Sequence, residues 1–397
     1  MIPDIRTSYN QRFTYEQYQA FLEGIAADAG IAPSFRIAET PVFVPVDLRN
    51  KLVQTCEEIV DVLLRPDFKT ITQDAIPSAL KVPHENEHPH FIVIDFAICE
   101  TAEGLVPQLI ELQGFPTMLS FQEVMARRFK QHFDIPASFS NFFNGHNETS
   151  YYQLLKEIIV GNVPPEEVVL LDIKPEEQKT RIDFHSTEKK LGISTVCLTA
   201  LIQEGKKLFY MRNGVKTPIQ RIYNRIIFDD LQQQADTLDE YVNIFQDLEV
   251  EWITHPNWFY RISKYIMPFI HSEYVPKSWF LHEIPVLPTD LENYVLKPLF
   301  SFAGQGVLID VTSADIDQIV DPENWILQHK VKYAPVIVTP TGPAICEIRM
   351  IYVWADGAAR PVLVHNLARI SKGKMIGVGF NNNDTWVGGS CCFFEQD

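Results

Sequence analysis

The sequence predicts an α+β fold that contains a small open α/β subdomain. Two strands at residues 91–98 and 105–113 flank a short turn, which is the spacing of an antiparallel hairpin. Residues 165–230 alternate short apolar runs with helical segments, as open α/β sheets do. Residues 294–390 carry several further strands separated by turns that contain glycine. We therefore expect antiparallel pairing on both sides of an α/β segment.

Composition and charge narrow the possible partners. The chain has 397 residues, of which 46% are hydrophobic, and this length predicts two or three closely packed subdomains. The formal net charge of −17 argues against nucleic acid and anionic membrane as main partners, because both require a basic surface. An anionic ligand must therefore bind a local cluster of cations.

The sequence has the features of a soluble, cytoplasmic protein. It contains neither a signal-peptide core nor a run of about 18 apolar residues, so no membrane partner is expected. The six cysteines are scattered without a C-x-x-C pair, and we expect reduced, buried thiols. These cysteines are Cys56, Cys99, Cys197, Cys346, Cys391 and Cys392.

Residues 1–90 predict a mainly helical region. Thr14 precedes an apolar-periodic segment that ends near Gly30, and a second helix is expected from Val46 to Leu64. The polar loop that follows carries three histidines, which we interpret as solvated, since no cysteine or carboxylate spacing supports a metal site. They are His84, His88 and His90.

The stretch Tyr294–Val307 has the features of a phosphate-binding turn. Lys297 ends an apolar strand, and Gly304 and Gly306 follow in a turn before a second short strand at residues 307–309. Converging backbone N–H groups bind anions, and glycine lets the backbone come close to them. We therefore predict a phosphate cradle formed by the lysine and the turn.

The hairpin offers a candidate cation site. Asp95 lies in an otherwise apolar strand, where a carboxylate is costly unless it is paired or binds a cation. Glu111 and Gln113 are two residues apart, so their side chains point to one face. Three converging oxygen ligands suit Mg²⁺, which also binds substrate phosphates. A sheet edge with solvated polar side chains explains the hairpin equally well.

The sequence contains two further groups of cationic side chains whose role it does not decide. Arg221 and Arg225 lie on one face of a strand, where they could clamp a substrate carboxylate or phosphate. Edge-strand surface charge is an equal alternative. Lys264 begins an apolar-periodic segment and has no special role when taken alone. The subdomain lacks Gly-x-Gly-x-x-Gly after its first strand, which argues against a dinucleotide site.

Together these segments resemble the ATP-grasp superfamily in its circularly permuted order, the branch that includes glutathionylspermidine synthetase. The matching segments in chain order are IDFAI with LIELQGFPT, VVLLDI through RIYNRI, LKPLFSFAGQGV, WILQHKV, and EIRMIYVW with NLARIS and NNNDTWVGGS. The resemblance implies an ATP-grasp fold with a small pre-ATP-grasp subdomain. Its expected parts are a helical region (1–90), metal-binding strands and helices (91–160), the α/β subdomain (165–230), a helical connection (231–285) and the nucleotide-binding sheet (286–397).

The resemblance implies a nucleotide site. Lys297 and Lys264 would hold the ATP phosphates. Arg349 and Arg369 would be the catalytic residues that stabilise the transferred phosphate and a bound carboxylate. The other cofactor-binding residues would cover the phosphates or meet the adenine. They are Ser301, Ala303, Gly304, Gln305 and Gly306 at the phosphates, and Gln328 and Val331 at the adenine.

The resemblance also implies that Asp95, Glu111 and Gln113 bind Mg²⁺. Two positions depart from the family pattern, since Gln113 replaces the usual Asn and Phe115 replaces the usual Asp of the next motif. Such enzymes phosphorylate a carboxylate with ATP and let an amine displace the phosphate. The implied function is a Mg-ATP-dependent carboxylate–amine, or peptide-like, ligase that acts through an acyl phosphate on a small-molecule or peptide substrate. A kinase of the same fold and a nucleotide-binding module without turnover are the alternatives.

Overall fold

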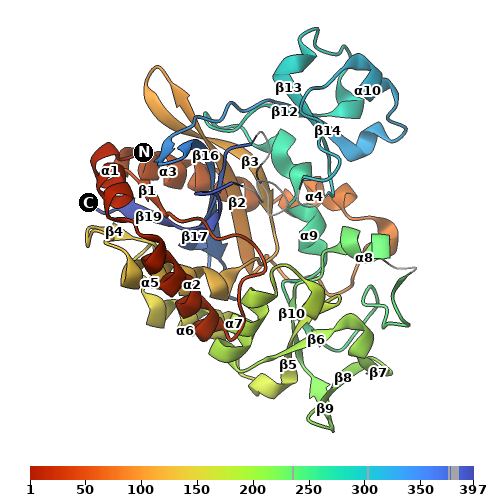
Figure 1. Cartoon of the computed structure of the whole chain (residues 1–397). Coiled ribbons are helices and arrows are strands. Elements are labelled where there is room, and N and C mark those ends of the chain that lie inside the picture. Colours follow the sequence, from red (N-terminus) through yellow and green to blue (C-terminus); the bar gives the residue numbers. More distant parts are fainter. Residues whose placement is uncertain (235–236, 302–303, 374–375, 377–383) are drawn as a thin grey trace.

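The structure, a computed structural model, describes residues 1–234, 237–301, 304–373, 376 and 384–397. Its centre is an antiparallel sheet that joins strands from the front of the chain to strands from its end (Figure 1). These strands are β2 (Phe91–Thr101), β3 (Gly104–Gln113), β15 (Ile337–Thr339), β16 (Gly342–Val353), β17 (Val362–Ser371) and β18 (Gly388–Ser390). Their order is β18-β17-β16-β2-β3, with β15 paired to β16.

The predicted hairpin is confirmed, and its register decides which face each side chain occupies. Asp95 lies opposite Glu111 in β3 and opposite Arg349 in β16. Even-numbered residues of β2, such as Ile94, pack with Ile348 in the largest apolar core. Because side chains alternate along a strand, the three charged residues point to the opposite face of the sheet.

Helix α3 (Val46–Leu63) covers the apolar face of the central sheet, where its Leu48 and Leu52 join the same core as Ile94. Its predicted span is confirmed to within one residue. Helix α2 (Tyr15–Ala29) is also confirmed: the Thr14 hydroxyl accepts a hydrogen bond from the Gln17 N–H. These two helices and α1 (Pro3–Arg12) make the amino-terminal region mainly helical, as expected.

A four-stranded parallel sheet forms the α/β subdomain in the lower part of Figure 1. Its strands are β5 (Val168–Asp172), β6 (Ser194–Cys197), β10 (Arg221–Asn224) and β11 (Glu251–Ile253), in the order β11-β10-β5-β6. Helix α7 (Arg181–Leu191) connects β5 to β6. The predicted α/β subdomain is therefore present, and it recruits β11 from beyond its predicted end.

The expected helical connection at residues 231–285 is wrong. The structure has only short helices there, and β11 joins the parallel sheet instead. Pro256 and Pro268 interrupt any long helix, and the apolar residues around Trp252 pair as a strand. The short helices are α8 (Phe228–Gln234), α9 (Asn257–Arg261) and a 3₁₀ helix (Lys264–Phe269). Strand β10 ends at Asn224, so Arg225, expected on the same strand as Arg221, lies just beyond it.

A separate lobe, at the upper right of Figure 1, contains a three-stranded antiparallel sheet. Its strands are β12 (Ser278–Phe280), β13 (Tyr294–Pro298) and β14 (Trp325–His329), in the order β12-β14-β13, with α10 (Ser313–Asp317) beside them. The sequence predicted one antiparallel sheet over residues 294–390, but the structure divides it between this lobe and the central sheet. The predicted strand at residues 307–309 reduces to one bridge between Leu296 and Leu308.

The remaining elements complete the covering layers. They are β1 (Val42–Val44), α4 (Phe68–Ile71), α5 (Leu119–His132), β4 (Phe139–Ser140), α6 (Glu148–Ile159), β7 (Ile202–Glu204), β8 (Lys207–Arg212), β9 (Val215–Ile219) and β19 (Cys392–Glu395). Across the described ranges, every helix is too short or too polar to cross a membrane. The architecture as a whole is α+β, with mixed helices and several sheets.

Candidate functional site

Two buried lysines from separate segments meet at one end of β3. The Nζ of Lys297, in β13, donates to the carbonyl oxygen of Ile110 at 2.9 Å. The Nζ of Lys264 donates to the carbonyl oxygen of Ser301 at 2.7 Å and lies 3.9 Å from a carboxylate oxygen of Glu111. Only 7% of Lys297 and 5% of Lys264 are exposed. We name this arrangement of Lys264, Lys297 and Glu111 the lysine cluster.

Burial lowers the pKa of Lys297 to about 8. Glu111 and Glu347 oppose this shift by attracting the ammonium, whereas Lys264 adds to it by repulsion. A buried ammonium is stabilised by an incoming anion, because water no longer solvates its charge. A strongly perturbed pKa of this kind is typical of functional sites.

The carboxylate of Asp95 is held by two arginines. Arg349 donates from Nε to Oδ1 at 2.6 Å and from a terminal nitrogen to Oδ2 at 2.5 Å. Arg369 donates to Oδ2 at 2.7 Å. Burial opposes ionisation of Asp95, but the two guanidinium groups outweigh burial and lower its pKa. Three of the roughly four acceptor positions of this carboxylate are therefore used.

Glu347 extends the same network along β16. A terminal nitrogen of Arg369 lies 3.1 Å from one carboxylate oxygen, and the Tyr333 hydroxyl donates to the other at 2.5 Å. Burial raises the pKa of Glu347, and Arg369 opposes this shift. Alternation along β16 puts Glu347 and Arg349 on one face of the strand, whereas nothing in the sequence signals Tyr333, which reaches Glu347 from the segment after β14.

A glycine brings the lysine cluster together. Gly114 directly follows β3, and its N–H donates to the carbonyl oxygen of Ile262 at 3.0 Å. A Cβ on Gly114 would lie 2.8 Å from the carbonyl oxygen of Trp258, closer than real Cβ atoms come. Only glycine therefore allows the segment that ends in Lys264 to pack against the end of β3, beside Glu111.

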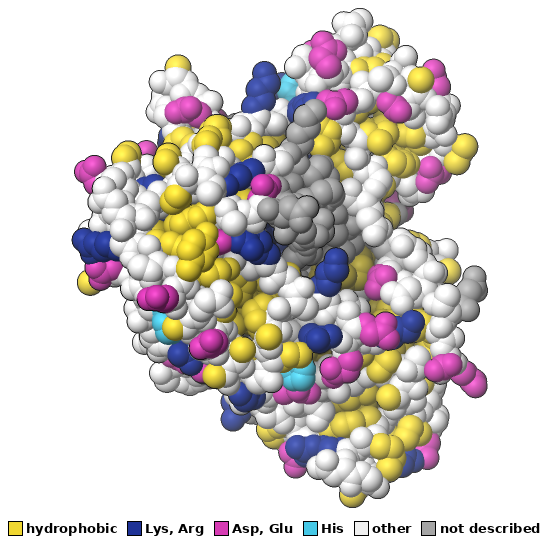
Figure 2. Space-filling model, viewed as in Figure 1, with side chains coloured by type: hydrophobic (Ala, Val, Ile, Leu, Met, Phe, Trp, Pro, Cys, Tyr) yellow, Lys and Arg dark blue, Asp and Glu magenta, His cyan; other side chains and the backbone are white. Residues whose placement is uncertain are grey.

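The predicted phosphate turn lies beside an open cavity. Gly304 and Gly306 adopt positive φ angles of 76° and 70°, which favour glycine. A cavity of about 380 Å³ opens there, lined by Gln232, Gln233, Phe300, Ser301 and Gln305. The space-filling view is hollowed between the β12–β14 lobe and the α/β subdomain (Figure 2). Ala303 lies outside the described residues.

The two predicted adenine contacts lie at different places. Gln328 is 1% exposed, sits opposite Val295 in β13, and has its Nε2 4.0 Å from the sulfur of Met267. Val331 instead packs against Cys99 and Val106 at the far end of the hairpin. The structure therefore brings Gln328, but not Val331, next to the strand that carries Lys297.

Arginines occupy one of the two carboxylates of the predicted Mg²⁺ site. Asp95, Glu111 and Gln113 share one face, but Asp95 is occupied by guanidinium groups. Glu111 keeps 26% of its side chain exposed, and the buried Nε2 of Gln113 has no hydrogen-bond partner. Within the described part of the chain, no three His, Cys, Asp or Glu side chains group as a metal centre. Glu111 offers a carboxylate and Gln113 an amide oxygen, which are ligand types that Mg²⁺ takes, so their predicted role as metal ligands stays a prediction.

Arg221 and Arg225 lie in the α/β subdomain with other partners. Arg221 donates to the carbonyl oxygen of Ile158 and to Glu251, each at 3.0 Å. Arg225 donates to Asp183 in α7 at 2.6 Å. None of these partners belongs to the lysine cluster, so their predicted role in binding substrate stays a prediction.

Comparisons with known proteins agree with the fold. No protein-family model matches the sequence, and neither does any curated protein. A solved structure of similar fold is that of a glutathione synthetase-like effector from Globodera pallida in its apo form. The two chains are 10% identical, with a TM-score of 0.58 over 96% of each chain. At this identity the likeness concerns the fold, and it includes most of residues 1–90.

Proposed function

We propose that the protein is a Mg²⁺- and ATP-dependent carboxylate–amine ligase that acts through an acyl phosphate. The observation that carries the proposal is the meeting of buried Lys264 and Lys297 beside Glu111 and an open cavity. Phosphoryl transfer depends on positioning and charge neutralisation more than on covalent catalysis, and buried cations supply both. The glutathione synthetase-like fold of the structural neighbour also supports an ATP-dependent ligase.

In the proposed reaction, a substrate carboxylate attacks the γ-phosphorus of ATP and ADP leaves. An amine then attacks the acyl carbon, phosphate leaves, and the nitrogen loses a proton. Lys264 and Lys297 bind the nucleotide phosphates. Arg369, whose side chain is 27% exposed, contacts the transferred phosphoryl group. Glu111 and the amide oxygen of Gln113 would hold Mg²⁺, which would supply charge neutralisation at the phosphate oxygens.

A second candidate is a nucleotide-binding module without turnover. One specific observation favours it: Asp95, a predicted metal ligand, makes three hydrogen bonds to Arg349 and Arg369 instead. A site with one fewer carboxylate for cations can still bind phosphate through its lysines. Such a site would lack part of the charge neutralisation that phosphoryl transfer requires.

Nucleotide binding is the first test of both candidates. Calorimetric titration with Mg²⁺ and a non-hydrolysable ATP analogue should give saturable binding, and Lys297→Ala should weaken it by about tenfold or more. Lys206→Ala is the control, since exposed Lys206 pairs with Asp247 and neither residue belongs to the lysine cluster. An unchanged affinity in Lys297→Ala would sink the assignment of the site.

Turnover separates the candidates. The protein should release ADP when ATP is supplied with pooled carboxylic acids and amines, and hydroxylamine should trap the acyl phosphate as a hydroxamate. Free phosphate among the products indicates a ligase, whereas phosphate that stays on the acceptor indicates a kinase. Nucleotide binding without ADP release would support the module without turnover.

A further inference from the structure

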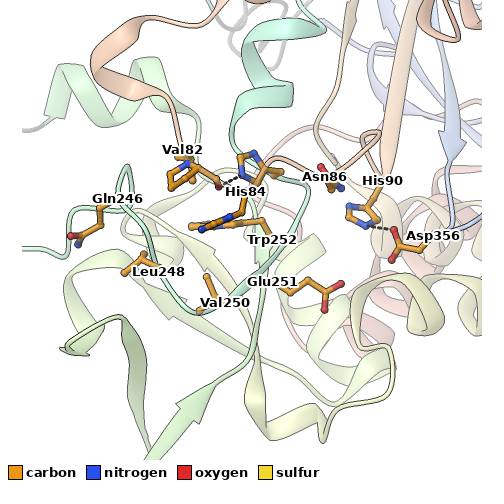
Figure 3. Close-up of a pocket in the computed structure, with 12 residues that line it drawn as sticks. Val82, His84, Asn86, His90, Gln246, Leu248, Val250, Glu251, Trp252 and Asp356 are labelled. Carbon is orange, nitrogen blue, oxygen red and sulfur yellow. Dashed lines mark hydrogen bonds and ion pairs between the residues drawn. The ribbon is translucent and has the colours of Figure 1, made fainter. Parts of the chain in front are cut away.

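A second pocket lies between the loop before β2 and the start of β11. It has a volume of about 250 Å³, and residues that line it include Asn86, His90, Glu251, Trp252 and Asp356 (Figure 3). His90 precedes Asp95 by five residues, so the pocket lies about 16 Å along the strand direction from the arginine-bound carboxylate. It shares no residue with the lysine cluster or with the cavity beside Ser301.

Asn86 presents an unpaired hydrogen-bond donor at this pocket. Its Oδ1 accepts a hydrogen bond from the indole Nε1 of Trp258 at 2.7 Å. An indole N–H can only donate, so this contact fixes which end of the amide is oxygen. The buried Nδ2 of Asn86 has no hydrogen-bond partner among the described residues. A ligand that fills the pocket can supply the missing acceptor.

His90 presents an unpaired ring nitrogen at the same pocket. The side chain is 2% exposed, and its Nε2 lies 3.3 Å from Oδ1 of Asp356 (Figure 3). With the proton of a neutral imidazole on Nε2, facing the carboxylate, Nδ1 is a hydrogen-bond acceptor. Both ring nitrogens are buried and make no hydrogen bond in the described chain, and Nε2 has only its electrostatic contact with Asp356. By contrast, both ring nitrogens of His255, another lining residue, have partners.

The charges around the pocket favour a cation. Glu251 and Asp356 contribute two carboxylates, and none of the lining residues is Lys or Arg. Arg221 binds one oxygen of Glu251 from outside the pocket. The other walls are apolar, with the ring of Trp252 beside Leu248 and Val250 (Figure 3). An ammonium with a short alkyl chain matches both kinds of wall.

We propose that this pocket binds a small alkylamine that carries an acceptor oxygen. The ammonium donates to Nδ1 of His90 and faces the carboxylates of Asp356 and Glu251. The oxygen accepts from Nδ2 of Asn86, and the alkyl chain packs on Trp252. The volume of about 250 Å³ restricts the ligand to a molecule smaller than a nucleotide.

An isosteric series of probes tests the proposal by calorimetry on the full chain. Methoxypropylamine has both the ammonium and an acceptor oxygen, pentylamine replaces the oxygen with a methylene, and methoxybutyrate reverses the charge. We expect methoxypropylamine to bind about tenfold more tightly than pentylamine, and methoxybutyrate not to bind. Failure of methoxypropylamine to bind at millimolar concentration, or equal binding of methoxybutyrate, would overturn the proposal.

Two variants assign the contacts. Asp356→Asn should weaken methoxypropylamine binding by about tenfold, while Asp317→Asn, in α10, should leave it unchanged. Asn86→Asp keeps the acceptor for Trp258 but replaces the free donor with a carboxylate. This variant should lose the preference for methoxypropylamine over pentylamine and gain affinity for diaminopentane. A preference that persists in Asn86→Asp contradicts the assigned oxygen contact.

Discussion

The guanidinium of Arg349 lies against both carboxylate oxygens of Asp95, at 2.6 Å from Oδ1 and 2.5 Å from Oδ2. The two residues are direct neighbours across β16 and β2, and 1% of Asp95 and 8% of Arg349 are exposed. The pair therefore places opposite charges inside a sheet whose other face is apolar. Its stability depends on every charge keeping its partner.

Asp95→Asn should destabilise the protein by about 3 kcal/mol, because it leaves the buried guanidinium of Arg349 without its counter charge, while Arg369 keeps only Glu347. Urea unfolding monitored by circular dichroism measures the loss. Asp61→Asn is the matched control, since Asp61 is 65% exposed in its pair with Arg360 and its loss should cost less than about 1 kcal/mol. Equal stability of the two variants would contradict a stabilising role for the buried contacts between Asp95 and its arginines.

Lys297→Met should stabilise the protein at pH 7 while it abolishes nucleotide binding. Lowering the pKa of Lys297 from 10.5 to about 8 corresponds to about 3 kcal/mol, and the lost hydrogen bond to Ile110 offsets about 1 kcal/mol. We therefore expect a gain of about 2 kcal/mol in the free energy of unfolding. A variant that is less stable than the wild type would show that burial of the Lys297 ammonium does not destabilise the folded protein.

The affinity for nucleotide should fall as pH rises through about 8. The folded-state pKa of Lys297 is lowered, so the free protein loses the charge that binds phosphate above that pH. Calorimetric titrations between pH 7 and pH 10 should show a decline of up to about tenfold per pH unit. Lys297→Arg is the control, because its guanidinium stays charged and its profile should be flat over this range.

His365→Gln should improve stability in mild acid. Burial lowers the pKa of His365 from 6.5 to about 4, so the unfolded chain binds the extra proton first as the pH falls. The wild type should lose about 3 kcal/mol between pH 6.5 and pH 4 from this group, and the variant should not. Urea midpoints at pH 7 and pH 5 give the comparison. His282→Gln, at a side chain that is 42% exposed, should change neither midpoint.

Gly114→Ala should weaken nucleotide binding without touching the ligand. The added Cβ would meet the carbonyl oxygen of Trp258 at 2.8 Å, so the segment that carries Lys264 must move away from Glu111. Calorimetry should show about tenfold weaker binding. Gly24→Ala is a suitable control, because this helical glycine faces the flexible side chain of Arg128. Unchanged binding in Gly114→Ala would separate the glycine from the site.

Much of the fold could be predicted because its signals are local. The cap at Thr14, the positive φ of Gly30 and the alternation of the β2–β3 hairpin all follow from neighbouring residues. The segment around Trp252 was wrongly expected to be helical, because only pairing with β10, some thirty positions earlier, makes it a strand. Sheet membership of this kind depends on distant partners.

In the candidate site, too, features with local sequence signals could be predicted, and features that depend on distant strand pairing could not. The sequence predicts a phosphate cradle at Lys297 and the two glycines of its turn, since the pattern lies in one segment, and the structure confirms the positive φ angles of these glycines. The binding of Asp95 by arginines could not be predicted, because the sequence places Arg349 and Asp95 on separate strands and gives no register between them. The same carboxylate can hold a metal or an arginine, and only the pairing of β16 with β2 brings the arginine to it.

The central sheet also sets the order in which the protein can mature during synthesis. Asp95 leaves the ribosome 254 residues before Arg349, its partner in the finished sheet. At about 5–20 residues per second, the β2–β3 hairpin waits roughly 13–50 s with one edge unpaired and one carboxylate uncompensated. During that interval the nascent chain is open to mispairing and to chaperones. Strands β16 and β17, made late, carry the two arginines that neutralise Asp95 in the early strand β2.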